Sequence, residues 1–202
     1  MIKLDIDTIL RFRGEVNGEK CICFYGEQES TWSILYKRDR SLIKSQKFYK
    51  VINPTESQII LNIYIFSDVT DALTFYYLKG VFFFSNSLIV IVDEQSKKEA
   101  AEYLRMRFNN FTSKAPKLNF FHRPQNSDLY LFYLDLLNLN IIYEKVSRPQ
   151  GLILNLKYKT IKLSLSFSEL NKLRFFLGIN DRKFKIKNKV LTPAYARQFI
   201  TW

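Results

Sequence analysis

The sequence predicts an α+β protein with several small sheets, and three observations support this prediction. Of its 202 residues, 47% are hydrophobic and only 6 are Gly and 5 Pro, which is the composition of a chain with a packed core. The first half is rich in short runs of β-branched and aromatic residues, which are typical of strands. The second half alternates helical and strand periodicity. We therefore expect a β-rich mixed domain at residues 1–93, followed by a part of the chain in which helices and small sheets alternate.

The first domain reads as hairpins followed by a strand–helix–strand unit. Runs at 20–26 and 31–36 are separated by Gly and charged residues, which indicates tight turns. Residues 59–66 form an apolar strand candidate, 71–78 a helix, and 82–92 one or two buried strands, so Phe82 is expected in the core. Cys21 and Cys23 share one face of a strand. With no other Cys and a single His, they cannot form a four-ligand zinc site.

In the second half, helices and strands alternate regularly after a boundary at 93–96. We expect a helix at 96–109, a basic extended stretch at 114–123, and a helix at 129–139 after a polar N-cap. Residues 141–143 and 151–158 read as paired strands, and 161–167 as another strand. A helix from 168 to 176 ends at Gly178, with Phe175 and Phe176 in its apolar face, and a last helix begins at Thr192.

The net charge of +12 lies entirely in the second half. Residues 1–93 hold 11 basic and 11 acidic residues, whereas 94–202 hold 20 and 8. Such asymmetry favours a polyanionic partner for the second half, and either no partner or a protein partner for the first. No apolar run reaches the roughly 18 residues needed to span a bilayer, and the first residues lack the features of a signal or transit peptide. The single His122 has no accompanying nucleophile motif, so we expect no catalytic site. Because no apolar run is long enough to span a bilayer, we also expect no membrane attachment.

A series of short motifs follows in order after residue 95. They are Leu-Arg-Met-Arg-Phe-Asn-Asn at 104–110, a basic stretch at 114–118, Leu-Lys-Tyr at 156–158, Leu-Gly-Ile at 177–179, Val-Leu-Thr at 190–192 and Tyr-Ala-Arg-Gln at 195–198. This order resembles the small-subunit ribosomal protein S-eight family, whose first helix ends in Arg-x-Arg-Asn and whose last part carries Leu-Gly-Ile and Ala-Arg. The family's Ser-Thr-Ser-Lys-Gly loop is replaced here by residues 185–189, and residues 1–93 match nothing in it.

The resemblance implies two small α/β sub-domains, at 94–160 and 161–202. It also implies a ribosomal component that binds the central domain of small-subunit ribosomal RNA, with no cofactor, metal or small-molecule substrate. Basic and short polar side chains suit contacts with phosphates and riboses. The residues expected to bind RNA are Arg105, Arg107, Asn109, Lys114, Lys117, Arg123, Lys183, Lys185, Lys187, Asn188, Lys189, Thr192 and Arg197. We expect residues 1–93 to dock on neighbouring ribosomal proteins. Such an extension and the Phe-, Ile-, Asn- and Lys-rich composition favour a mitochondrial ribosome over a bacterial or plastid one.

Two alternatives remain open from the sequence. Residues 63–67 and 89–94 faintly resemble the acidic strand ends of a Toprim-type metal-dependent nucleic-acid enzyme, although Ser67 stands where the first Glu is expected. In that hypothesis Asp93 would bind the metal. The second alternative is a free-standing RNA-binding regulator, which the sequence does not distinguish from a ribosomal component.

Overall fold

The computed structural model describes residues 2–18, 20–28, 30–36, 42–108, 116–121, 128–148, 151–166, 169, 172–178, 185–186 and 200–201. The chain begins with strand β1 (Ile2–Lys3) and helix α1 (Ile6–Arg11), which Asp5 caps by accepting a hydrogen bond from the Thr8 amide at 2.6 Å. A four-stranded antiparallel meander follows: β2 (Gly14–Asn17), β3 (Cys21–Tyr25), β4 (Trp32–Tyr36) and β5 (Leu42–Lys44). The expected hairpins are thus confirmed.

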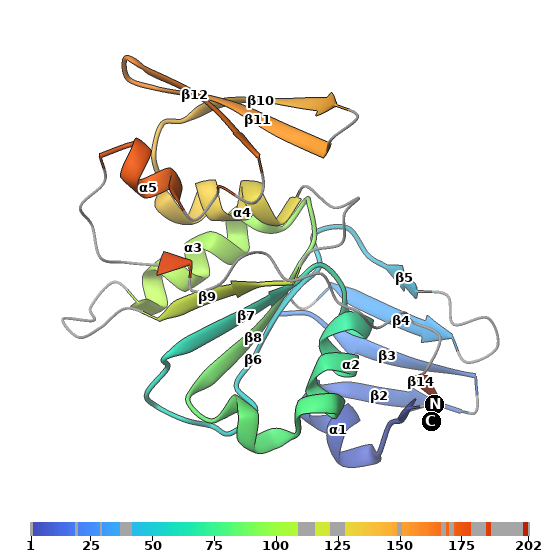
Figure 1. The fold of residues 1–202 in the computed structure, drawn as a ribbon. Helices are drawn as coiled ribbons and strands as arrows, with labels where there is room; N and C mark the ends of the chain where they lie inside the picture. Colours follow the sequence, from blue (N-terminus) through green and yellow to red (C-terminus); the bar gives the residue numbers. More distant parts are fainter. Residues whose placement is uncertain are drawn as a thin grey trace.

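A five-stranded sheet forms the centre of the molecule (Figure 1). Its order is β13 (Lys185–Ile186), β9 (Lys117–Phe120), β7 (Asn62–Phe66), β8 (Ser87–Val92) and β6 (Tyr49–Ile52). Strands β13, β9, β7 and β8 pair in parallel, and β6 is antiparallel to β8. Helix α2 (Val69–Lys79) and the 3-10 turn η1 (Val81–Phe84) join β7 to β8, and α3 (Lys97–Phe108) leads from β8 towards β9.

The central sheet is buried on both faces, which explains its apolar strands. In β7, Ile63 and Ile65 belong to a core that includes α3, whereas Tyr64 and Phe66 belong to a second core that includes α2. Successive side chains of a strand point to opposite faces, so the two helices cover opposite sides of the sheet. The second core also takes in α1, through Ile9, and the meander, through residues such as Phe24 of β3.

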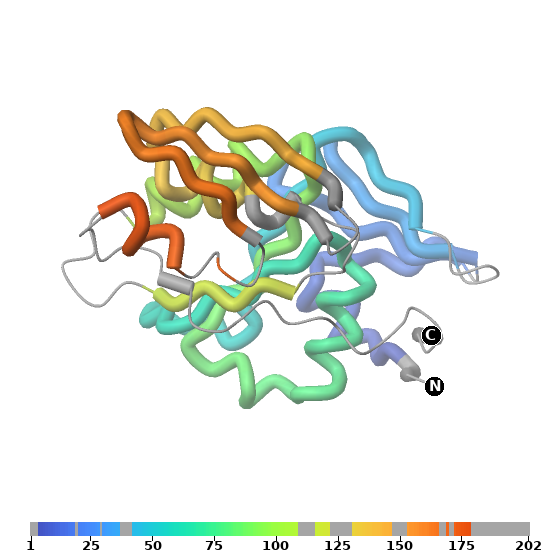
Figure 2. The backbone as a smooth tube through the Cα atoms, turned by 45° about the horizontal axis from the view of Figure 1, so that its top comes forward, coloured from blue at the N-terminus to red at the C-terminus, as the bar shows by residue number. Residues whose placement is uncertain are grey.

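A third sheet lies over the helices that cover the first core. Strands β10 (Ile142–Arg148), β11 (Gly151–Tyr158) and β12 (Ile161–Ser166) pair antiparallel in sequence order. Helix α4 (Asp128–Leu137) separates this sheet from α3, and the short α5 (Leu173–Phe176) lies beside it (Figures 1 and 2). Strands β1 and β14 (Ile200–Thr201) pair in parallel, so the two ends of the chain meet.

The structure confirms the α+β class and corrects two packing expectations. Phe82 is 89% exposed and Phe175 is 84% exposed, so neither lies in the core as their apolar runs predicted. The central sheet also draws strands from both sides of the expected boundary at 93–96, because β9 and β13 pair alongside β7. The helix expected from Thr192 lies outside the described residues.

Candidate nucleic-acid interface

Two basic segments that are far apart in the sequence lie side by side at one edge of the central sheet. In the parallel pairing of β13 with β9, Lys185 is opposite Lys117 and Ile186 is opposite Leu118. The Lys117 side chain is exposed, whereas the next residue, Leu118, is fully buried. Asn119, which lies on the same face of β9 as Lys117, is buried, so Lys117 is exposed because it is the first residue of the strand. For Lys185 the structure describes only the backbone.

The last turn of α3 adds one exposed cation to this end of the sheet. Helix α3 runs in the direction opposite to the parallel strands, so its C-terminus lies at the end of the sheet where β9 begins (Figure 1). Arg107 is exposed, and its guanidinium donates a hydrogen bond to the Tyr103 hydroxyl at 3.2 Å. Arg107 and Lys117 are thus two solvent-facing cations on elements that a rigid core holds in place, as a phosphate-binding surface requires.

Arg105 has a different environment from Arg107. It is half-buried, and its guanidinium donates a hydrogen bond to the main-chain carbonyl of Asp135 in α4. The pKa of the Asp135 side chain is raised because the carboxyl is half-buried, while Lys97, Lys98 and Arg105 act in the opposite direction. Arg105 therefore ties α3 to α4, and its positive charge partly offsets the burial of the Asp135 carboxyl. Its guanidinium is less accessible to RNA than that of Arg107.

All of the other expected RNA-binding residues lie outside the described part of the chain. These are Asn109, Lys114, Arg123, Lys183, Lys187, Asn188, Lys189, Thr192 and Arg197. Among the described residues, the structure pairs Lys117 with the backbone of Lys185 and places Arg107 in the last turn of α3, at the end of the sheet where β9 begins (Figure 1).

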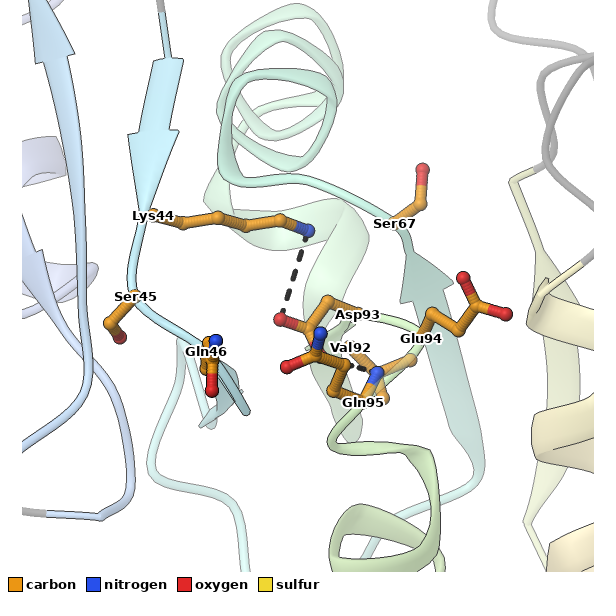
Figure 3. A pocket seen from close by; sticks show the side chains of 8 residues that line it. All are labelled: Lys44, Ser45, Gln46, Ser67, Val92, Asp93, Glu94 and Gln95. Carbon is orange, nitrogen blue, oxygen red and sulfur yellow. Dashed lines mark hydrogen bonds and ion pairs between the residues drawn. The ribbon is translucent and has the colours of Figure 1, made fainter.

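A hollow lies at the end of the central sheet where the parallel strands β7 and β8 end (Figure 3). Ser67 follows β7 and Asp93 follows β8, and the chain then leaves to α2 on one face and α3 on the other. In open α/β sheets, ligands bind at such a point. The hollow measures about 340 Å³ and is lined by Lys44, Ser45, Gln46, Ser67, Val92, Asp93, Glu94 and Gln95. This is the place where the Toprim hypothesis expects a metal.

Asp93 is already fully engaged by the protein. One carboxylate oxygen accepts hydrogen bonds from the Gln95 amide at 3.0 Å and from the Ser96 amide and hydroxyl, both at 2.8 Å. The other oxygen accepts from the Phe48 amide at 3.1 Å and lies 3.9 Å from the Lys44 ammonium. The carboxylate holds the turn before α3 and ties β6 to β8, so few lone pairs remain for a metal. In the described ranges no three His, Cys, Asp or Glu side chains cluster as metal ligands.

Cys21 and Cys23 lie in β3 of the meander, and Cys23 is near Lys50, a buried lysine of β6. Cys23 is partly exposed, and burial is the main cause that raises the pKa of its thiol above 9.0. A reactive cysteine needs the opposite shift. Lys50 is fully buried and donates a hydrogen bond to the Tyr25 carbonyl, and burial lowers the pKa of its ammonium to about 8. This arrangement supplies no activated nucleophile at Cys23.

Helices within the described ranges are all too short or too polar to cross a bilayer. No protein-family model, no curated protein and no solved structure matches this chain.

Proposed function

We propose that this chain is an S-eight-type component of the small ribosomal subunit, which binds the central domain of small-subunit ribosomal RNA in a mitochondrial ribosome. The observation that carries the proposal is the pairing of β13 with β9, which sets Lys185 opposite Lys117 at what we call the basic edge. These two lysines belong to the two segments that are expected to contact RNA. Paired strands hold the backbones of two lysines at a fixed spacing, which a solvated basic loop does not, and phosphate contacts need such fixed positions.

The order of elements gives further support. A helix with arginines in its last turn is followed by a basic strand, an apolar helix and a hairpin, as α3, β9, α4 and β10–β11. This is the order that the resemblance to the S-eight family leads us to expect after residue 95. The charge asymmetry agrees, because all the excess positive charge lies in this half.

Residues 1–93 are proposed to dock on neighbouring ribosomal proteins. An exposed apolar patch lies at the end of the central sheet where strands β7 and β8 begin. It is formed by α2, η1 and the segment before β7. Its members are Ile59, Leu61, Tyr77, Leu78, Phe82 and Phe83. The Leu61 amide donates a hydrogen bond to the Asn86 carbonyl at 2.7 Å, so the segment before β7 lies against the residues that follow η1. An exposed aromatic patch on the part of the chain without net charge suits contact with protein.

Crosslinking of the native protein to RNA, followed by sequencing of the attached RNA, tests the proposal. We expect the crosslinks to map to the central domain of small-subunit ribosomal RNA. Crosslinks scattered over many messages, with no sedimentation on small subunits in high salt, would favour a free-standing regulator. Absence of any RNA crosslink would refute RNA binding altogether.

A pair of variants locates the contact. Arg107→Ala/Lys117→Ala removes the two exposed cations at the basic edge, and Lys20→Ala/Lys98→Ala removes two exposed lysines elsewhere, with the same change in net charge. Removal of phosphate contacts lowers affinity and flattens its salt dependence, with the slope reduced by about 1 per contact. We expect this only in the first variant. Equal effects in both would mean that net charge alone drives binding.

A further inference from the structure

The outer face of the β10–β11–β12 sheet carries an unneutralised pair of lysines. The strands β11 and β12 are joined by a two-residue turn at Lys159 and Thr160, in which Lys159 has a φ of 52°. The turn fixes the register, so Lys157 lies directly opposite Lys162. Both side chains are exposed, and neither ammonium has an acidic partner at ion-pair distance in the part of the chain that the structure describes.

Like charges in this position are unfavourable for the isolated protein. Directly opposed residues of an antiparallel pair have their Cβ atoms about 4.5–5.5 Å apart, and like charges there are destabilising. The pair is not needed for packing, because the opposite face of the same strands supplies the buried Leu154, Leu156 and Leu165. A bound anion between the two ammonium groups would remove the repulsion.

The lysines border a hollow whose lining also includes side chains that can form hydrogen bonds. The hollow measures about 430 Å³ and spans all three strands. Asn155 and Ser164 face each other in the next cross-strand row, and the Ser164 hydroxyl donates to the Asn155 side-chain oxygen at 2.7 Å. That bond leaves the two amide hydrogens of Asn155 as donors. Ile142, which is 69% exposed, stands beside the lysines as an apolar wall.

We propose that this face is a second RNA-binding surface, on which Lys157 and Lys162 hold a backbone phosphate of an RNA strand and Asn155 hydrogen-bonds an adjacent ribose or base. This inference rests on the proposed function and adds a contact surface that is separate from the basic edge at β9 and β13. Charge complementarity selects RNA as the occupant, since the lysines outnumber the only acidic side chain of the hollow, Glu144. Single strands laid across a sheet are a common mode of RNA recognition.

The test compares affinities for an in vitro transcript of the central domain of small-subunit ribosomal RNA, measured by filter binding between about 0.05 and 0.2 M KCl. Lys157→Ala/Lys162→Ala is expected to weaken binding about 30-fold near 0.1 M salt and to reduce the salt slope by about 2. Lys157→Arg/Lys162→Arg should bind nearly as the original protein does. The charge-matched Lys20→Ala/Lys98→Ala variant should stay within about twofold, because both of its lysines lie outside the hollow.

The outcomes separate this inference from the proposed function. If the original protein binds the transcript, Arg107→Ala/Lys117→Ala weakens binding and Lys157→Ala/Lys162→Ala does not, the second surface is refuted and the proposed function stands. If the original protein does not bind, both fall. Mapping of crosslinked peptides on the original protein gives an answer that is independent of any variant's folding. A crosslinked peptide from residues 151–166 supports the surface, and its absence among abundant crosslinks from other segments counts against it.

Discussion

The buried amine of Lys50 predicts a distinctive pH dependence of stability. Lys50 has no exposed surface, and burial lowers its pKa from 10.5 to about 8. In the unfolded chain the same ammonium keeps its proton up to about pH 10.4. Between these values the unfolded state binds more protons than the folded state, so the free energy of unfolding rises with pH. Below pH 8 both states are protonated, and the full cost of burying the charge is present.

The size of the effect follows from the two pKa values. Raising the pH from 7 to 10 should add about 2.5 kcal/mol to the free energy of unfolding through this one group. Other groups act in the opposite direction, because burial raises the pKa values of Tyr49, Tyr64, Tyr76 and the Cys23 thiol. Their ionisation lowers the free energy of unfolding at alkaline pH in every variant that retains them. The Lys50 contribution is therefore obtained as a difference between two proteins.

Urea unfolding followed by circular dichroism at pH 7, 8, 9 and 10 measures this difference. We expect the original protein to gain about 2–3 kcal/mol relative to Lys50→Met across the series. Lys20→Met, which changes an exposed lysine, should run parallel to the original protein. Parallel profiles for Lys50→Met as well, within about 0.5 kcal/mol, would show that the Lys50 ammonium is solvated in the folded state and would refute the reasoning.

Three further stability predictions follow from the contacts of charged side chains. Asp93→Ala should lower the free energy of unfolding by about 2–3 kcal/mol, because it removes the acceptor of the buried hydrogen bonds from the Ser96 and Phe48 amides, whereas Glu94→Ala should change it by less than about 0.5 kcal/mol; equal urea midpoints would contradict this. Arg105→Met should cost about 1–2 kcal/mol through its contact with α4, and Arg107→Met almost nothing, with the reverse order counting against the assigned roles. Lys162→Gln should stabilise the protein by about 0.2–1 kcal/mol in low salt and not in 1 M salt, as calorimetry would measure; a gain that persists in high salt would exclude charge repulsion as its cause.

Local elements of this fold could be predicted from the sequence because their signals are local. The helix expected at 71–78 is α2 (Val69–Lys79), and the one expected at 96–109 is α3 (Lys97–Phe108). Asp68 caps α2 by accepting a hydrogen bond from the Asp71 amide, and Asp93 fixes the turn that leads into α3 by accepting one from the Ser96 amide. Hydrophobic periodicity and capping groups lie within a few residues of each other, so one window of sequence contains the whole signal.

Strand partners could not be predicted in this way. The pairing of Ile63 with Leu118 joins residues more than 50 positions apart, and nothing within either strand names the other. Burial fails similarly at single positions. Lys50 lies inside the protein and Phe82 outside it, although ordinary preferences place them the other way round. In both cases the surrounding tertiary structure decides the outcome.

The candidate interface was predictable in part for the same reasons. Its composition came from the charge asymmetry, but the meeting of Lys117 with Lys185 depends on a long-range parallel pair. The pair of Lys157 and Lys162 carried a local signal, because a two-residue turn between alternating strands fixes which residues face each other. The engagement of Arg105 by α4 required the packed structure.

The position of β9 has a consequence for how the chain folds as it is synthesised. Strand β7 is made by residue 66, yet its partner on one side, β9, is not complete until residue 120. A nascent chain that ends between them presents an apolar strand with an open hydrogen-bonding edge, which is a template for association with other chains. We therefore expect a fragment of residues 1–96 to aggregate, and one that extends beyond β9 to be far more soluble. The half of the protein that carries no net charge thus depends on a strand from the basic half to close its own sheet.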